Sequence, residues 1–192
     1  MKIGIYGGSF NPIHFGHIGL AKWVTENTDL NEVWLMVSPS NPLKSKSILV
    51  DEQERLVAAK ETIGDGLLDI GKRIVVSDFE FHLPRPTYTA NTLRALAKEY
   101  PEYDFTLIIG EDNLQIFNKW REYEYILKNY RLFVYPRRKA PKNATSVFEA
   151  PAEAKSDEAM RLLGNEAKEI IFLEGAPYFD ISSTELRKNL HK

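Results

Sequence analysis

The chain of 192 residues contains no cysteine, and this absence excludes several kinds of chemistry at once. Without thiols there are no disulfides, no thiolate nucleophile and no cysteine-ligated zinc site. The chain also lacks an apolar run long enough to cross a bilayer. Its first residues, MKIGIYGG, do not have the charge pattern and cleavage site of a signal peptide. A soluble, cytoplasmic protein is therefore expected.

The sequence has little net charge of either sign. The 27 acidic and 25 basic residues give a formal charge of −2, so no overall basic field favours nucleic acid or an anionic membrane. We expect neither as a partner, and a site for an anion has to be built locally. The length and the 43% of hydrophobic residues suit one domain over residues 1–192. A stretch rich in Ala, Lys, Glu and Pro predicts a variable loop and helical insertion at about 137–167.

Short apolar runs alternate with segments of helical periodicity along most of the chain. The helical segments include 15–27, one at 51–64 that Asp51 is expected to cap, and one at 89–100 with Thr89 as the expected cap. Shorter helices are expected at 111–117 and 122–129, and a closing helix at 182–190. The apolar runs predict six strands, at 2–6, 32–38, 73–78, 105–110, 131–136 and 169–175. This alternation is typical of parallel βαβ units and predicts an α/β fold with a doubly wound parallel sheet.

Each unusual polar stretch follows the carboxyl end of a predicted strand. In an open parallel sheet these ends share one edge, and ligands bind in the crevice there. We therefore expect one ligand site built from several loops. The stretches are GGSFNP, SPSNPLK, LPRPTYT, GEDN, PRRK and FDISST.

The first of these stretches leads into two histidines, in the segment GGSFNPIHFGH at 7–17. Gly7 and Gly8 permit a tight turn, and a helix that starts near His14 would point free N–H groups into the crevice, where they suit a phosphate. His14 and His17 are three apart, so they share a helical face and point at the same anion. The Gly-Lys-Ser/Thr ending of a Walker loop and the GxGxxG pattern are both missing. A zinc pair is the alternative, with a third ligand from His82 or a carboxylate at no recognisable spacing.

The segment 7–17 resembles the GGxFxPxHxGH signature of the nucleotidyltransferase superfamily, which also includes class I aminoacyl-tRNA synthetases. The late ISSTELR at 181–187 resembles the ISSTxIR motif of its small adenylyltransferases. Two inner segments, PTYTANTLRAL at 86–96 and IIGEDNLQIFNKWREYEYIL at 108–127, resemble bacterial nicotinate-nucleotide adenylyltransferases. Where that family often reads Pro-Pro-His-Lys, this chain has Asn-Pro-Leu-Lys at 41–44, so the lysine is kept and Leu43 replaces the histidine.

The resemblance implies a Rossmann-like nucleotidyltransferase fold and a reaction between ATP and nicotinate mononucleotide that gives deamido-NAD and pyrophosphate in NAD biosynthesis. The phosphate of the mononucleotide attacks the α-phosphorus of ATP, and no protein nucleophile is needed. By this resemblance His14 and His17 are the catalytic residues. The ATP-binding residues are Gly8, Ser9, Phe10, His17, Gly110, Asp112, Ser182, Ser183 and Arg187.

For the mononucleotide, the resemblance implies Lys44 at its phosphate, the helix start at Tyr88 and Thr89, and Trp120 as a stacking surface. Arg137 and Arg138 are further candidates for phosphate contacts. Mg²⁺ is expected mainly on ATP oxygens, with no dedicated protein metal site. A homo-oligomer is left open. Alternatives are an adenylyltransferase for nicotinamide mononucleotide or phosphopantetheine, or a non-catalytic nucleotide-binding sensor.

Overall fold

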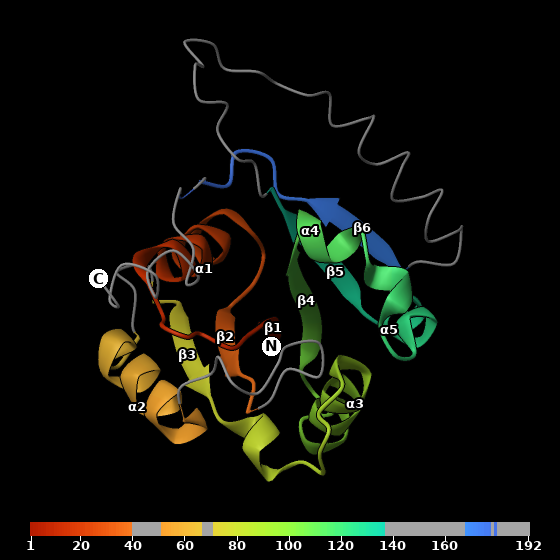
Figure 1. The fold of residues 1–192 in the computed structure, drawn as a ribbon. Helices are drawn as coiled ribbons and strands as arrows, with labels where there is room; N and C mark the ends of the chain where they lie inside the picture. The colour runs from red at the N-terminus through yellow and green to blue at the C-terminus, as the bar shows by residue number, and fades with distance from the viewer. Residues whose placement is uncertain (40–50, 67–70, 137–167, 178, 180–192) are drawn as a thin grey trace.

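The computed structural model describes residues 1–39, 51–66, 71–136, 168–177 and 179. Six strands form one parallel sheet in the order β3-β2-β1-β4-β5-β6 (Figure 1). This sheet confirms the predicted α/β fold. Its strands are β1 (Lys2–Gly8), β2 (Glu32–Val37), β3 (Arg73–Ser77), β4 (Asp104–Gly110), β5 (Arg131–Tyr135) and β6 (Glu169–Phe172).

Helices cover both faces of the sheet, as the predicted doubly wound arrangement requires. In Figure 1, α1 and α2 lie on one side of the strands and α3 and α5 on the other. The helices are α1 (Phe15–Asn27), α2 (Glu52–Ile63), α3 (Thr89–Glu99), α4 (Glu111–Leu114) and α5 (Tyr123–Asn129), with short 3₁₀ helices η2 (Phe79–His82) and η3 (Phe117–Lys119).

Two hydrophobic cores result, one on each face. Because side chains alternate along a strand, Leu107 and Ile109 of β4 join the core under α3 and α5, whereas Ile108 joins the core under α1 and α2. All β4 residues after Asp104 are buried, which is expected for a strand covered on both faces. The predicted single domain over residues 1–192 and the insertion at 137–167 stay predictions, since 137–167 lies outside the described residues.

The helix starts were predicted with mixed success. Asp51 caps α2 as expected, because its carboxylate accepts the N–H groups of Gln53 at 2.8 Å and Glu54 at 3.4 Å. The prediction for Thr89 was wrong: Thr89 is the first residue of α3, and Tyr88 is the N-cap. Tyr88 has the extended backbone of a cap residue (φ −88°, ψ 142°), and no side chain accepts a hydrogen bond there. The first N–H groups of α3 are thus not covered by a capping side chain.

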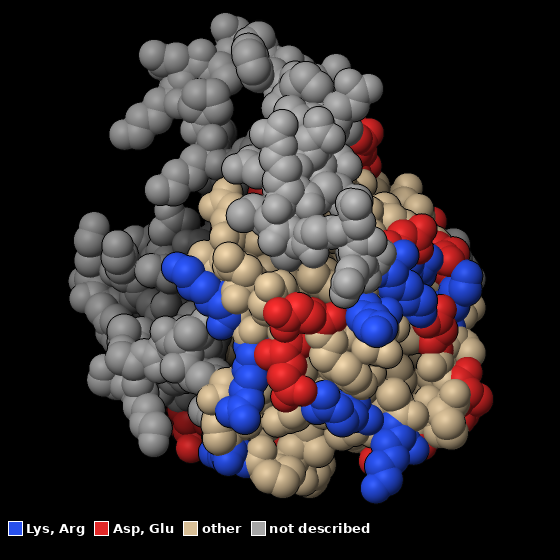
Figure 2. Space-filling view, turned by 90° about the vertical axis from the view of Figure 1, so that its right-hand side faces the viewer, with Lys and Arg blue, Asp and Glu red and all other residues tan. Residues whose placement is uncertain are grey.

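Charged side chains of both signs are interspersed on the face of the molecule that carries α3 and α5 (Figure 2). Two of the ion pairs among the described residues, Arg94–Glu122 at 2.8 Å and Lys168–Asp104 at 3.8 Å, belong to these elements or the strands beside them. Among the described residues, no helix combines the length and the apolar character that crossing a membrane requires.

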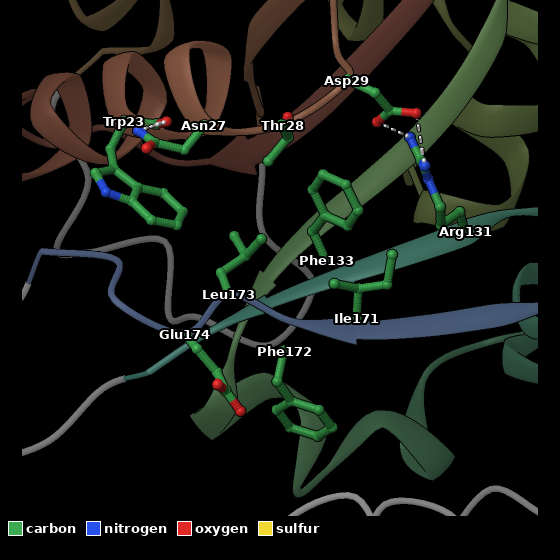
Figure 3. A pocket seen from close by; sticks show the side chains of 10 residues that line it. All are labelled: Trp23, Asn27, Thr28, Asp29, Arg131, Phe133, Ile171, Phe172, Leu173 and Glu174. Atoms are coloured by element: carbon green, nitrogen blue, oxygen red, sulfur yellow. Dashed lines mark hydrogen bonds and ion pairs between the residues drawn. The ribbon is translucent and has the colours of Figure 1, made fainter. Parts of the chain in front are cut away.

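One ion-pair cluster ties the amino ends of two strands to the turn after α1. The carboxylate of Asp29 accepts two hydrogen bonds from Arg131 at the start of β5, at 2.8 and 3.1 Å, and is paired with Lys2 of β1. Figure 3 shows the Asp29–Arg131 pair at one end of a pocket. These hydrogen bonds, with Arg131 contributing most, lower the pKa of Asp29 to about 2, against the opposing effect of burial.

We predict that Asp29→Asn lowers the free energy of unfolding near neutral pH by about 1 kcal/mol, the scale of a partly exposed ion pair. Because the folded-state pKa of Asp29 is below its ordinary value, this contribution is present above about pH 4 and is lost as the pH falls towards about 2. Urea unfolding at several pH values checks this. Glu61→Gln, which removes an exposed carboxylate, is the control. If the free energies of unfolding of Asp29→Asn and wild type differ by the same amount at every pH, the role of the charge is contradicted.

Candidate active site

The order of the strands places a switch point between β1 and β4. From β1 the chain moves outward to β2 and β3, and it then returns to β4 on the other side. The pairing of β1 with β4 stops at Tyr6–Ile108, whereas Gly7 and Gly8 still pair with β2. The two central strands therefore separate at their carboxyl ends. A crevice at this position is where open α/β sheets bind ligands.

The turn after β1 is formed by different residues from those that we predicted. Gly7 and Gly8 are the last residues of β1, and the backbone first takes a positive φ at Phe10 (42°). A Cβ on Gly8 would lie 3.1–3.3 Å from the Phe10 ring, whereas one on Gly7 would meet no atom within 4 Å. Gly8 therefore makes room for Phe10, and Gly7 leaves open space over the end of the strand. The positive φ of Phe10 is held by its buried ring, which packs edge-on against Tyr6 and His17.

The two histidines lie together at the start of α1, as the spacing predicts. His14 is the N-cap, and its ring stacks on that of His17 with centroids 3.7 Å apart and planes 26° apart. The backbone N–H of His14 donates to Nδ1 of His17 at 3.3 Å. Because Nδ1 accepts, the neutral ring of His17 carries its proton on Nε2, where it can serve as a donor. Both rings are half-buried.

Phe179 packs against α1 at Gly16 and Gly19, beside the histidines. A Cβ on Gly16 would lie 3.1 Å from Cβ of Phe179, and one on Gly19 would lie 2.2 Å from its Cζ. A Cβ at position 19 would overlap the Phe179 ring, and one at position 16 would crowd both Phe179 and the His14 ring, so the two glycines let the aromatic ring lie close to the helix. Phe179 thereby brings the late part of the chain next to the first turn of α1, three residues before Ser182 in the sequence.

A buried arginine joins the loops after β1 and β2. Arg55 of α2 is 3% exposed, and its guanidinium donates to the carbonyl oxygens of Ser9, Ser38 (3.0 Å) and Pro39 (3.0 Å). Burial lowers the pKa of Arg55, while the neighbouring Glu52 and Asp51 act in the opposite direction. The N–H of Ser38 also donates to the carbonyl of Gly8 at 2.9 Å. These contacts hold the first polar loop against the second.

The start of α3 forms another part of the same sheet edge. Asn91 and Thr92 donate their N–H groups to the carbonyl of Tyr88, whereas none of the hydrogen bonds within the described residues starts from the N–H of Thr89 or Ala90. These two donors and the helix dipole suit an anionic group.

A buried carboxyl group lies beneath this helix start. Glu80 of η2 is 6% exposed, and it accepts a hydrogen bond from the Thr92 hydroxyl at 2.8 Å. Burial raises the pKa of Glu80, and the hydroxyls of Thr92, Ser38 and Thr87 act against this increase.

Trp120 and Arg121 lie next to the start of α3. The guanidinium carbon of Arg121 is 5.1 Å from the centre of the Tyr88 ring. Trp120 is half-buried, and its ring packs against Phe117 with centroids 5.0 Å apart. Trp120 is therefore anchored to the core, and part of its surface stays exposed. Sequence reasoning overlooked Arg121, although its place between Trp120 and a predicted helix was a usable signal.

The remaining predicted residues are placed only in part. Gly110 ends β4 and is the N-cap of α4, and Asp112 is exposed in that short helix. The zinc alternative finds no support among the described residues, which contain no group of three or more histidine or carboxylate side chains that could hold a metal. Outside the described residues lie Lys44, Arg137, Arg138, Ser182, Ser183 and Arg187.

The pocket drawn in Figure 3 is a different feature from the predicted site. It measures about 420 Å³ and lies between the end of α1 and strands β5 and β6, with Trp23, Arg131 and Phe133 in its wall. None of the predicted site residues lines it.

Comparisons with known proteins agree with the fold and with the motifs. The profile of the family described as cytidylyltransferase-like matches residues 5–189. A protein of Flavobacterium psychrophilum named "Probable nicotinate-nucleotide adenylyltransferase" is 41% identical over 190 residues, which cover 99% of this chain and 86% of that protein. A Bacteroides fragilis protein of the same name is 41% identical over 98% of this chain and 82% of its own length.

A solved structure shares the fold. The Plasmodium falciparum nicotinic acid mononucleotide adenylyltransferase, described as complexed with NaAD, aligns with a TM-score of 0.74 at 22% identity, over 97% of this chain and 82% of that one. The family resemblance predicted from the motifs is thus confirmed by sequence over almost the whole chain. The chain belongs to the nicotinate-nucleotide adenylyltransferase family, within the cytidylyltransferase-like proteins.

Proposed function

We propose that this chain transfers the adenylyl group of ATP to nicotinate mononucleotide in the cytoplasm, giving deamido-NAD and pyrophosphate for NAD biosynthesis. The observation that carries the proposal is the stacked His14–His17 pair at the start of α1, just after the carboxyl end of β1, where its pairing with β4 stops. The 41% identity to relatives named for this activity supports the choice of substrate.

The histidine pair suits the phosphates of ATP. Nε2 of His17 donates to an oxygen of the α-phosphate, and His14 donates from the neighbouring ring. The dipole of α1 adds positive potential at the same place. The attacking group is the phosphate of the mononucleotide, so the protein positions the two reactants in line and stabilises the charge that develops between them.

Other phosphate contacts are proposed from the motifs alone. Ser182, Ser183 and Arg187 hold the triphosphate of ATP, and Lys44 holds the phosphate of the mononucleotide. Gly8, Ser9 and Phe10 form the wall of the ATP site, with Gly110 and Asp112 on its other side. Arg137 and Arg138 are further candidates for phosphate contacts.

The start of α3 suits the pyridine carboxylate. The N–H groups of Thr89 and Ala90 and the helix dipole attract a negatively charged acceptor. The amide of nicotinamide mononucleotide would turn an N–H donor towards these donors in one orientation. Trp120 stacks on the ring with its exposed surface. The site therefore favours the acid over the amide.

Magnesium fits this site as a partner of ATP. Mg²⁺ commonly keeps several waters and binds through substrate phosphates with one or two carboxylates. In this proposal Asp112, exposed in α4 shortly after β4, contacts a water on such an ion or the ribose. When bound, the ion neutralises charge on the phosphates.

The test of the proposed function is pyrophosphate release with ATP and Mg²⁺. We expect release only when a pyridine mononucleotide is added, with a higher kcat/KM for the nicotinate form. Phosphopantetheine is the matched alternative acceptor. Release that requires phosphopantetheine, or no release from the folded protein with any acceptor, would contradict the proposal in favour of another adenylyltransferase or a nucleotide sensor.

We predict that His17→Ala lowers kcat by about two orders of magnitude, because a preorganised donor at developing charge contributes about 3 kcal/mol. Steady-state kinetics with both substrates checks this. His82→Ala is the control, since His82 is a largely exposed histidine in η2. A His17→Ala enzyme as active as the control would mean that the histidine pair is purely structural.

We predict that Trp120→Ala raises the KM for the mononucleotide and leaves the KM for ATP nearly unchanged, because stacking on a base contributes about 1–3 kcal/mol. Trp120→Phe keeps an aromatic surface and should retain much of the affinity. Thermal unfolding of both variants measures the lost packing against Phe117 separately. A defect confined to ATP would rule out the stacking role.

A further inference from the structure

A cation that makes no ion pair with any described residue lies beside the start of α3. Arg121 is exposed, and its guanidinium carbon lies 5.1 Å from the centre of the Tyr88 ring. Tyr88 is the N-cap of α3, directly before the open N–H groups of Thr89 and Ala90. The positive charge of Arg121 is therefore held next to two donors that already favour an anion.

The nearest carboxylate in the sequence is already taken. Glu122 has a left-handed backbone (φ 54°) at the N-cap of α5, and its carboxylate pairs with Arg94 at 2.8 Å. Within the part of the chain that the structure describes, Arg121 makes no ion pair of its own. Of the other cations in and beside α3, η3 and α5, Lys168 and Arg94 have acidic partners, whereas Lys98, Lys119 and Lys128 have none among the described residues. Arg121 differs from these lysines because the Tyr88 ring holds its guanidinium at the start of α3, where its charge is available to a ligand.

The ring of Tyr88 holds this guanidinium without neutralising it. A cation–π contact is attractive but leaves the edge of the guanidinium, with its N–H donors, free to bind a carboxylate. Trp120, the neighbouring residue, is fixed against Phe117. A ring stacked on Trp120 would therefore have the charge of Arg121 and the N–H groups of α3 within the same small region.

We propose that Arg121 is a specificity-determining residue that binds the carboxylate of the pyridine ring and so selects nicotinate mononucleotide over the amide. This inference rests on the proposed function and adds to it a residue outside the motifs. An amide has no charge to pair with the guanidinium, so the contribution of Arg121 applies to the acid alone.

The test compares kcat/KM for the two mononucleotides in wild type, Arg121→Gln and Arg121→Lys. We expect Arg121→Gln to lower kcat/KM for nicotinate mononucleotide about tenfold and to change that for the amide less than twofold, so that the preference shrinks about tenfold. Arg121→Lys keeps a charge and should retain part of the preference. Lys98→Gln, at the far end of α3, removes one exposed positive charge from the same helix and should leave the preference unchanged.

Salt provides an independent measurement. Because an exposed charge pair is screened, the KM of wild type for the acid should rise with ionic strength more steeply than that of Arg121→Gln. If wild type prefers the acid and Arg121→Gln keeps that preference, this inference is wrong while the proposed function stands. If Lys98→Gln loses as much preference as Arg121→Gln, general surface charge is responsible, and the inference is also wrong. A wild-type protein that uses neither mononucleotide overturns the proposed function and this inference with it.

Discussion

Three carbonyl oxygens that meet around the guanidinium of Arg55 hold together the loops at the carboxyl ends of β1 and β2. The carbonyls of Ser9, Ser38 and Pro39 lie just after the last register pair of β1 and β2, Gly8–Val37. Hydrogen bonds from a charged donor contribute about 1.5–3 kcal/mol each, and a buried carbonyl left without a donor costs a comparable amount. Arg55 therefore fixes the loop that leads to His14 relative to the first residues after β2. The geometry of the histidine pair depends on it, because Phe10, which packs on His17, follows Ser9 directly.

Much of this arrangement is visible in the sequence, and the exceptions have physical causes. The six strands are apolar runs with helices between them, so their order along the chain and their parallel direction follow from pattern alone. The histidine pair follows from a spacing of three on a helix. Thr89 was misplaced as a cap because threonine is a common capping residue, whereas the start of α3 depends on the backbone of Tyr88.

The burial of Arg55 and the ion pairing of Arg121 could not be predicted from the sequence pattern. In the sequence both are arginines in polar surroundings, which usually face solvent. Arg55 is buried because the loops after β1 and β2 fold over it, and Arg121 makes no ion pair among the described residues, where Arg94 of α3 takes the adjacent Glu122. Both facts arise from contacts between segments far apart in the sequence. The potential at this edge of the sheet is therefore set by individual charges such as Arg55 and Arg121, because the net charge of the protein is close to zero.

The packing of Phe179 on α1 also affects the order in which parts of the molecule can fold. Gly16 and Gly19 leave the ribosome long before Phe179 does, because Phe179 lies far later in the chain. Until then the glycine surface of α1 is open to water, although the sheet strands before β6 are already available to pair. The entropy cost of closing so long a loop grows only with the logarithm of its length. Phe179 can pack on α1 only after the ribosome has synthesised it. Before then, a nascent chain can form most of its core, but its first helix lacks the contact with the Phe179 ring.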